Sequence, residues 1–212
     1  MLQDDTDSTT KNFIVFEGID GSGTTTQLAR LASFLESRNI PHLVTAEPTK
    51  RPEGRLIRSI LKGDIDAHAG TVAYLFAADR HEHFHGHHGI AENLVAGRVV
   101  VCDRYVWSSL AYQGLACGED LPASLNRRFP RPGLTLFFRI DPERAMARVS
   151  ARQTLEIYEK LHIQKQVAAT YEKILAAELH HSARIVIIDA EKSLDDVTEQ
   201  VCRAVCVHLG LE

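Results

Sequence analysis

The sequence predicts a single α/β domain built on a doubly wound sheet of five parallel strands. Its 212 residues suffice for one domain with a proper core and are too few for two ordinary domains without a linker. Short apolar, β-branched runs recur along the chain, and longer stretches with helical spacing of apolar residues separate them. Because strand and helix alternate, we expect right-handed crossovers that place helices on both faces of the sheet.

The five predicted strands are apolar on both faces, which is typical of parallel strands covered from both sides. They comprise residues 12–17, 42–46, 98–102, 134–140 and 185–189. The predicted helices comprise residues 25–36, 53–61, 71–96, 142–148, 155–179 and 194–209. Proline and glycine at residues 129–133 predict a loop before the fourth strand. Ligands of such sheets bind beyond the carboxyl ends of the strands, so residues that follow each strand are candidates for function.

Composition and charge restrict the class of partner. Residues 1–10 are polar and acidic and are expected to form a mobile tail, followed by a single domain over residues 11–212. The formal net charge of -4 provides no overall basic field, so a nucleic acid polymer is not expected as a partner. No run approaches the ~18 apolar residues of a membrane span, so no membrane partner is expected. The four cysteines lack paired metal-ligand spacing, and reduced thiols in the cytoplasm fit them best.

A glycine-rich segment joins the first predicted strand to the first predicted helix, which is the context of a phosphate-binding P-loop. Its glycines allow backbone N–H groups to converge on phosphate oxygens, and the helix N-terminus adds its positive end. Thr25 occupies the serine or threonine position that ligates Mg²⁺. We therefore expect a fold of the P-loop NTPase type in which ATP is bound by Gly18, Ile19, Asp20, Gly21, Ser22, Gly23, Thr24, Thr25 and Thr26.

The P-loop departs from its consensus at one position, because Thr24 stands where a lysine is usual. A threonine hydroxyl can bond a phosphate but supplies no charge, and losing a charge-assisted contact costs roughly 1.5–3 kcal/mol. Two hypotheses stay open. Either another cation substitutes, or the protein binds nucleotides and transfers phosphoryl groups poorly. The candidate substitutes are Lys50, Arg51, Arg55 and Lys160, each of which could equally be a solvated surface charge.

Asp103 follows the third predicted strand directly. A carboxylate at the end of a buried apolar strand is the Walker B arrangement, in which it holds Mg²⁺ beside the phosphates. The alternative is an N-cap for the helix that follows. Taken together with the P-loop, the pattern favours a metal site formed by Thr25 and Asp103.

Four motifs, taken in order and spacing, are similar to those of thymidylate kinases. They are FEGIDGSG with TTQ after it, Glu47-Pro48 after the second strand, LFAADR at residues 75–80 and DRYVWSSLAYQG at residues 103–114. The resemblance covers most of the chain. It implies a P-loop kinase domain over residues 11–212, phosphoryl transfer from ATP to dTMP giving dTDP and ADP in dTTP synthesis, Mg²⁺ as cofactor and a homodimer. A kinase for another nucleoside or nucleotide is the alternative within the same fold.

The resemblance also implies a dTMP site. Asp20 would face the sugar and phosphate, Arg104 would hold the phosphate, and Phe76 would stack on thymine, as aromatic faces and guanidinium groups can. Ordinary core packing is the alternative for Phe76 and Tyr112, and surface solvation is the alternative for Arg58. Arg80 would hydrogen-bond the base, Ser109 would face it, and Tyr112 would lie against the deoxyribose. The expected dTMP-binding residues are Asp20, Glu47, Arg58, Phe76, Arg80, Arg104, Ser108, Ser109, Tyr112 and Gln113.

Residues 145–160 correspond to the lid that closes over the phosphates in such enzymes. Arg148 and Arg152 lie four apart and would project from one helical face toward the nucleotide. The residues expected to act in catalysis are therefore Asp20, Arg104, Arg148 and Arg152.

Five histidines occur within residues 81–88, in the run HEHFHGHH. His81 with His85, or His83 with His87, has the i,i+4 spacing of a helical metal site. Gly86 and the lack of a clear third ligand favour the alternative of a solvated helix.

Overall fold

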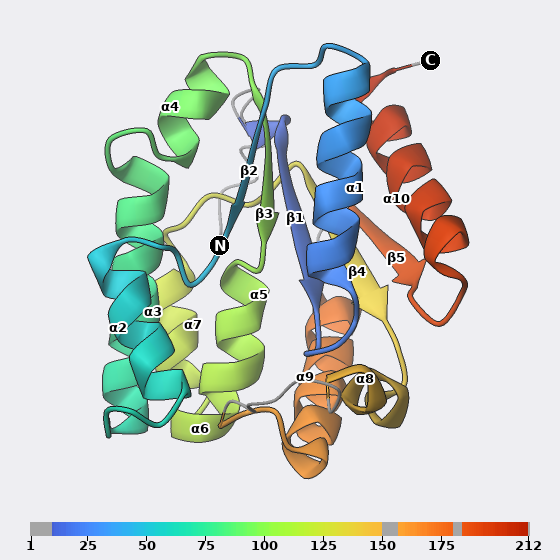
Figure 1. The fold of residues 1–212 in the computed structure, drawn as a ribbon. Coiled ribbons are helices and arrows are strands. Elements are labelled where there is room, and N and C mark those ends of the chain that lie inside the picture. The colour runs from blue at the N-terminus through green and yellow to red at the C-terminus, as the bar shows by residue number, and fades with distance from the viewer. Residues whose placement is uncertain (1–9, 150–156, 180–183, 212) are drawn as a thin grey trace.

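The computed structural model describes residues 10–149, 157–179 and 184–211. Within them the chain forms a sheet of five parallel strands in the order β2-β3-β1-β4-β5 (Figure 1). The strands are β1 (Phe13–Gly18), β2 (His42–Ala46), β3 (Val99–Asp103), β4 (Leu134–Arg139) and β5 (Ile185–Asp189). The predicted fold class and the five strands are thus confirmed, with bounds that differ by one residue at most.

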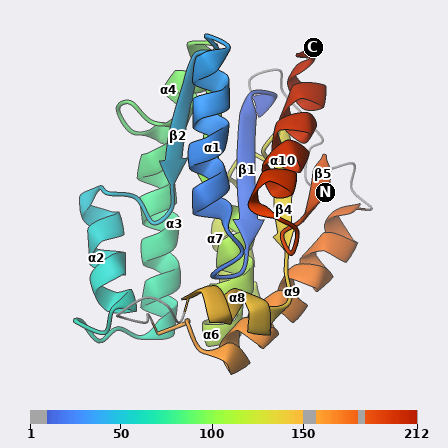
Figure 2. The same cartoon turned by 45° about the vertical axis from the view of Figure 1, so that its right-hand side comes forward.

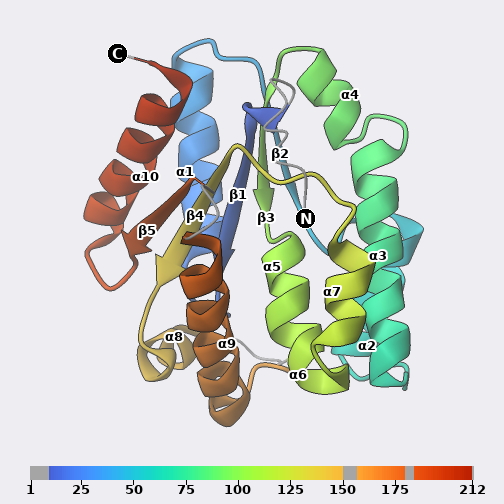
Figure 3. The same ribbon diagram turned by 180° about the vertical axis from the view of Figure 1, so that it is seen from behind.

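Helices cover both faces of the sheet. Helices α1 (Thr24–Ser37) and α10 (Leu194–Leu209) pack against each other on one face (Figures 1 and 2). Helices α3 (Ala69–His85), α4 (Ile90–Val95) and α9 (Leu161–Leu179) lie on the opposite face (Figure 3). The side chains of β1 alternate between the two faces, so this strand, buried along its whole length, anchors both halves of the core.

The remaining helices surround the carboxyl ends of the strands. Helix α2 (Pro52–Leu61) packs on α3, and α8 (Pro142–Val149) packs on α9. After β3 the chain continues through α5 (Val106–Ser108), a π-helical turn (Ser109–Gln113), α6 (Gly114–Cys117) and α7 (Asp120–Asn126). The predicted loop at residues 129–133 is confirmed. Within the described part of the chain, no helix combines the length and apolarity that crossing a membrane requires.

The prediction of one helix over residues 71–96 is wrong. Helix α3 ends at His85, and α4 begins at Ile90. The two glycines of the intervening link cause the break, because Gly86 leaves the helical conformation with ψ near 170° and Gly89 is extended with ψ near -177°. His88 between them adopts a left-handed φ of 56°.

The structure bears on two other predicted segments, the helix over residues 155–179 and the tail over residues 1–10. The helix predicted over residues 155–179 begins at Leu161, and residues 157–160 form a turn, whereas residues 155 and 156 lie outside the described part. Thr10, assigned to the tail, is buried, and its carbonyl oxygen accepts a hydrogen bond from the Gly133 N–H at 3.0 Å. Residues 1–9 of the expected tail and residues 150–156 of the expected lid are outside the described residues.

The close approach of α2 to the segment after β2 provides a test of the fold. A Cβ atom on Gly54 would overlap the backbone of Thr49, so Gly54→Ala is expected to destabilise the protein by about 1–3 kcal/mol in urea unfolding. Gly114→Ala is the matched control, because Gly114 is helical and the nearest heavy atom would lie 3.9 Å away. That change is expected to stabilise by about 0.4–1 kcal/mol. Equal stability of the two variants would contradict this packing.

Candidate active site

A cavity of about 590 Å³ opens beyond the carboxyl ends of β1, β2 and β3. The P-loop, α2, α3, α8 and the turn after β3 surround it. The structure thereby gathers residues that lie far apart in the sequence. The predicted site residues that line the cavity are Ile19, Asp20, Gly21, Gly23, Thr24, Thr25, Thr26, Glu47, Arg58, Phe76, Asp103, Arg104, Ser108, Tyr112, Gln113 and Arg148.

Four of the predicted residues do not line this cavity. Gly18 and Ser22 lie in the buried base of the P-loop, and Arg80 and Ser109 lie beneath the cavity wall. Arg152 falls outside the described residues.

The P-loop has the backbone that a phosphate cradle needs. Gly21 and Gly23 have φ values of 84° and 93°, which residues other than glycine rarely adopt. Gly23 is the N-cap of α1, and no side chain caps this helix, so the N-terminus of α1 faces the cavity through backbone groups. A Cβ atom on Gly21 would overlap the carbonyl group of Ala145, so α8 packs directly on the loop. The cradle therefore depends on glycine at both positions.

Thr25 and Asp103 meet as predicted. The Thr25 hydroxyl donates a hydrogen bond to Asp103 Oδ2 at 3.0 Å, and Asp103 is only 8% exposed. Asp103 Oδ1 is buried and has no hydrogen-bond partner among the described residues. The parallel register places Asp103 opposite Phe16, two residues before the P-loop. A hydroxyl and an orphaned carboxylate oxygen are the hard ligands that Mg²⁺ prefers, so these residues fit that ion.

Arg104 joins the P-loop to the turn after β3. Its Nη2 lies 2.6 Å from Asp20 Oδ1, and its Nη1 donates to the Gly18 carbonyl oxygen at 3.1 Å. The guanidinium carbon lies 5.0 Å from the centroid of the Tyr112 ring, a cation–π distance. The left-handed φ of Arg104, 70°, directs the chain away from the sheet at this point. A positive charge is thus fixed at the cavity wall between the P-loop and Tyr112.

Gln164 of α9 is a site residue that the sequence did not indicate. Its side chain is fully buried, and its Oε1 accepts a hydrogen bond from the Asp20 N–H at 3.1 Å. Its Nε2 donates to Asp20 Oδ2 at 2.7 Å and to the Tyr158 carbonyl oxygen at 2.9 Å. One amide therefore connects the P-loop, α9 and the segment before α9. A glutamine within a helical pattern shows no local sign of this burial.

Glu17 is the second residue without a predicted role. The carboxylate is buried, and its Oε1 accepts hydrogen bonds from the N–H groups of Tyr105 at 3.0 Å and Ser108 at 3.3 Å. The hydroxyls of Ser108 and Tyr171 donate to Oε2 at 2.6 and 2.9 Å. Burial raises the pKa of Glu17, and the two hydroxyl bonds act in the opposite direction. Glu17 thereby fixes the start of the segment that carries Ser108 and Tyr112.

Arg80 has a different environment from the one expected. It is 1% exposed, and each of its three side-chain nitrogens has a partner within the protein. Nε and Nη2 bond Glu47 Oε2 at 2.9 and 2.7 Å, and Nη2 also donates to the Tyr105 carbonyl oxygen at 2.8 Å. Nη1 donates to the side chains of Ser109 and Asn126. In this structure Arg80 supports Glu47 and Ser109 from below the cavity.

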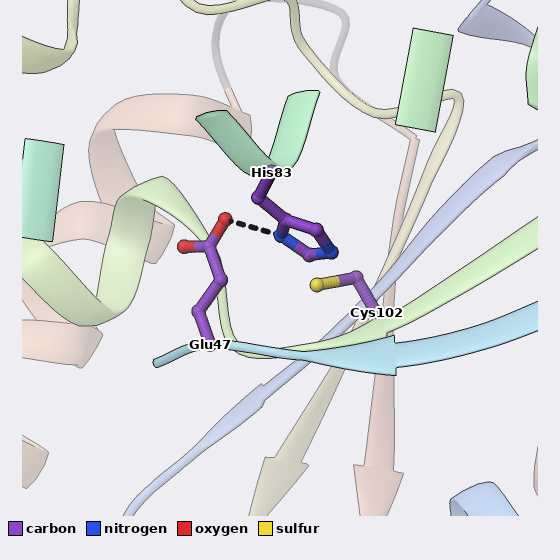
Figure 4. A group of neighbouring side chains, drawn as sticks. All are labelled: Glu47, His83 and Cys102. Carbon is purple, nitrogen blue, oxygen red and sulfur yellow. Dashed lines mark hydrogen bonds and ion pairs between the residues drawn. The ribbon is translucent and has the colours of Figure 1, made fainter. Parts of the chain in front are cut away.

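Glu47 is held from its other side by His83. Figure 4 shows the two side chains with Cys102 beside them, and His83 Nδ1 lies 3.0 Å from Glu47 Oε1. His83 Nε2 lies 2.7 Å from the Thr45 hydroxyl, and the Cys102 thiol donates to the Arg104 carbonyl oxygen at 3.1 Å. Burial raises the pKa of this thiol well above its usual value. The three groups are close enough to hold a metal ion. Because each has its own partner and Glu47 already contacts a guanidinium group, they form a hydrogen-bonded support for Glu47.

The remaining predicted residues line opposite ends of the cavity. Phe76 on α3 is half-buried, so part of its ring faces the cavity. Arg58 on α2 donates to the carbonyl oxygen of Pro48, whose bond to Glu47 is cis. Arg148 on α8 donates from Nη2 to the Ala190 carbonyl oxygen at 3.0 Å. Its Nη1 lies 4.0 Å from the position of a Cβ on Gly23. The side chain of Arg148 therefore extends from α8 to the P-loop.

The hydrogen bonds of the Gln164 amide can be tested by measuring the free energy of unfolding. Gln164→Leu removes the partner of the Asp20 N–H and one of the two donors to the Tyr158 carbonyl oxygen, which keeps the Lys160 N–H, and a buried group left unpaired costs about 1–3 kcal/mol. We expect a matching loss in the free energy of unfolding, measured in urea. Gln166→Leu, on an exposed position of the same helix, is the control and is expected to stay within ~0.5 kcal/mol of the parent. If both variants unfold alike, Gln164 does not hold the P-loop.

Comparison with known proteins agrees with this geometry. The family described as thymidylate kinase matches residues 16–201. A "Putative thymidylate kinase" of Treponema pallidum (strain Nichols) is 40% identical over 194 residues, which cover 90% of this chain and 92% of the relative. "Probable thymidylate kinases" of Pyrococcus horikoshii and Methanocaldococcus jannaschii are 39% and 38% identical, and each alignment covers 89% of this chain and 93% of the relative. Similarity of this extent shows that the chain belongs to the thymidylate kinase family.

Proposed function

We propose that this protein transfers the γ-phosphoryl group of ATP to dTMP, giving ADP and dTDP, as a step in the synthesis of dTTP. The observation that carries the proposal is the shared cavity. Its one end is formed by the P-loop with Thr25 and Asp103, and its other end by Phe76, Arg104 and Gln113. A donor and an acceptor nucleotide can therefore meet with their phosphates near the P-loop. The family and the printed names of the relatives support the same reaction.

The ATP end of the cavity holds charge through backbone groups and oxygen ligands. The N–H groups of the P-loop and the first turn of α1 would bind the phosphates. Thr25 and the unpartnered Oδ1 of Asp103 would hold Mg²⁺. When bound, the ion neutralises charge that develops on the transferred group. No covalent enzyme intermediate is needed, because positioning and electrostatics supply the catalysis of phosphoryl transfer.

At the other end, the protein would select the acceptor. Arg104 lies at the cavity wall with its charge balanced by Asp20, a position suited to the dTMP phosphate. Phe76 would stack on the base, and Tyr112 would lie against the deoxyribose. The predicted bond from Arg80 to the base would require Arg80 to exchange one of its present partners. We therefore assign Arg80 the role of holding Glu47 and Ser109.

Gln113 favours a thymine or uracil base over a cytosine base. Gln113 lines the cavity, and its buried Oε1 has no hydrogen-bond partner among the described residues. Thymine and uracil present a donor at N3, whereas cytosine presents an acceptor there. A free amide oxygen can therefore bond the first two and repels the third. Leaving such a group unpaired carries a penalty of about 1–3 kcal/mol.

Arg148 is the strongest candidate for the charge that Thr24 lacks. Arg58, Arg104 and Arg148 are the described cations that line the cavity, and Arg148 is the one that approaches Gly23. The other candidates are less suited. Arg51 bonds Glu82 and the His87 carbonyl oxygen, and Arg55 bonds the Lys50 carbonyl oxygen. Arg152 remains a proposal from the sequence.

The assembly and location of the protein are also proposals. We propose a homodimer, because members of the family commonly pair through helices on one face of the sheet. The exposed apolar side chains of Tyr74 on α3 and Leu115 on α6, which are 58% and 43% exposed, support a protein contact near these helices. We propose that the protein works in the cytoplasm, where both nucleotides and reduced thiols are found.

An assay of ADP release with ATP and Mg²⁺ tests the function. We expect the highest kcat/KM with dTMP, followed by dUMP, and lower values with UMP, CMP and dCMP. Asp103→Asn keeps the shape of the side chain and removes its charge, so it should lower kcat roughly 10²-fold through loss of about 3 kcal/mol. Absence of turnover when both nucleotides bind would refute the enzyme proposal. Preference for a cytosine nucleotide would refute the assignment of Gln113.

A double-mutant cycle tests how the P-loop charge is supplied. If Arg148 supplies it, Thr24→Lys alone changes kcat by less than ~3-fold, whereas Arg148→Gln lowers kcat roughly 10–150-fold, the equivalent of one charge-assisted bond. Adding Thr24→Lys to Arg148→Gln should then restore most of the loss. A large gain from Thr24→Lys alone would favour the alternative of a nucleotide-binding protein with little transfer activity. A change in KM for ATP alone would show that Arg148 binds ATP without stabilising the transition state.

A further inference from the structure

The link between α3 and α4 has a backbone that few other sequences could adopt. A Cβ on Gly89 would lie 2.6 Å from the Gly86 carbonyl oxygen and 2.7 Å from that of His83, and a Cβ on Gly86 would overlap Glu82. His88 is held at a φ of 56°, and its N–H donates to Glu92 Oε2 at 2.7 Å. The turn is thus fixed by two necessary glycines and by hydrogen bonds that include the one from the His88 N–H to Glu92. It places the side chains of His87 and His88 next to each other.

Both imidazoles of this turn face the same carboxylate. His88 Nδ1 lies 3.3 Å from Glu92 Oε1, and His87 Nδ1 lies 3.6 Å from Glu92 Oε2. The centroids of the two rings are 3.7 Å apart. One nitrogen from each ring and one carboxylate oxygen fall within 4.8 Å of one another.

We propose that His87, His88 and Glu92 bind one divalent transition-metal ion of the zinc type, with water completing the coordination. In a tetrahedral site with metal–ligand distances of about 2.0–2.1 Å, neighbouring ligand atoms lie roughly 3.3–3.4 Å apart. His88 Nδ1 lies 3.3 Å from Glu92 Oε1, which matches one such edge before any ion is present. His87 Nδ1 lies 3.6 Å from the other oxygen, Oε2, so the His87 ring must turn from its stacked position to bind the same ion. Two imidazoles with one carboxylate suit zinc, nickel or copper better than magnesium.

The charges around this turn permit a cation. The nearest cation that the structure pairs with the turn is Arg51, which donates to the His87 carbonyl oxygen at 2.7 Å and bonds Glu82 at 2.8 Å. Its charge is therefore offset by Glu82 and lies on the backbone side of the turn. The ligand side is open to solvent, since the side chains of His87, His88 and Glu92 are 82%, 75% and 53% exposed. An ion can reach the site without any opening of the fold.

The other histidines of the run are less suited. His81 and His85 stack at 4.8 Å between ring centroids and are not joined by a third candidate ligand in the described part of the chain. His83 is buried against Glu47 and Thr45, and α3 ends at His85, so the predicted pair of His83 and His87 does not share a helical face. The turn, and not the helix, therefore forms the metal site.

Calorimetric titration of the untagged full-length chain with ZnCl₂, in excess Mg²⁺, tests the proposal. We expect one zinc ion per chain with a dissociation constant in the micromolar range. The double variant His87→Ala/His88→Ala should bind at least ~10-fold more weakly, and Glu92→Gln should show a comparable loss. The matched control His81→Ala/His85→Ala should bind as the parent does. Circular dichroism and thermal unfolding of each variant show that the fold is intact.

A second probe reports the geometry. Co²⁺ in a four-coordinate site with nitrogen and oxygen ligands absorbs visible light far more strongly than hexaaqua Co²⁺, so the parent and the control should gain this absorption on titration and the turn variants should not. The proposal is overturned if the parent binds neither ion, if the turn variants bind as well as the parent, or if the control loses binding instead. Because none of these residues contacts the nucleotide cavity, the outcome is independent of the kinase assay.

Discussion

The carboxylate of Asp20 is the point on which the site depends. It accepts from Arg104 on one oxygen and from Gln164 on the other, while the Asp20 N–H donates to the same Gln164 amide. The P-loop, the end of β3 and α9 are therefore fixed relative to one another by a single residue. Shifting Asp20 would take one hydrogen-bond partner from the Arg104 guanidinium group and one from the Gln164 amide. Such coupled bonds hold the cavity in one arrangement more firmly than separate contacts would.

Buried charge has a similar role beneath the part of the cavity that we propose for dTMP. Arg80 and Glu47 are almost fully buried, and desolvating such a pair can cost as much free energy as their attraction returns. The contribution of this pair is to position the segments around it. Arg80 bonds three further segments through Tyr105, Ser109 and Asn126, so the turn after β3 and α7 are placed together. The Arg80–Glu47 pair thus fixes the part of the cavity wall against which the base would lie, whether or not the pair adds stability.

Much of this architecture could be predicted from local patterns. The strands follow from apolar runs, and the meeting of Thr25 with Asp103 follows because parallel strands end at one edge of a sheet. The break at Gly86 could not be predicted as well, since an isolated glycine costs a helix only about 1 kcal/mol and often stays inside one. Gln164 and the burial of Arg80 were missed for a different reason. Their partners lie up to 144 residues away, so no local pattern records them.

With Thr24 in place of a lysine, this fold can separate the binding of a phosphate from the neutralisation of its charge. In the proposed function, the glycines of the P-loop and the N-terminus of α1 would bind phosphate through backbone dipoles, which do not depend on the residue at position 24. A lysine there would place its charge on the same loop that makes the cradle. Arg148 instead comes from α8, which is anchored to the loop where Gly21 meets Ala145 and leads into the predicted lid. If that arginine supplies the charge, neutralisation depends on where α8 lies, so phosphate binding by the P-loop and neutralisation of the phosphate charge are controlled by different elements.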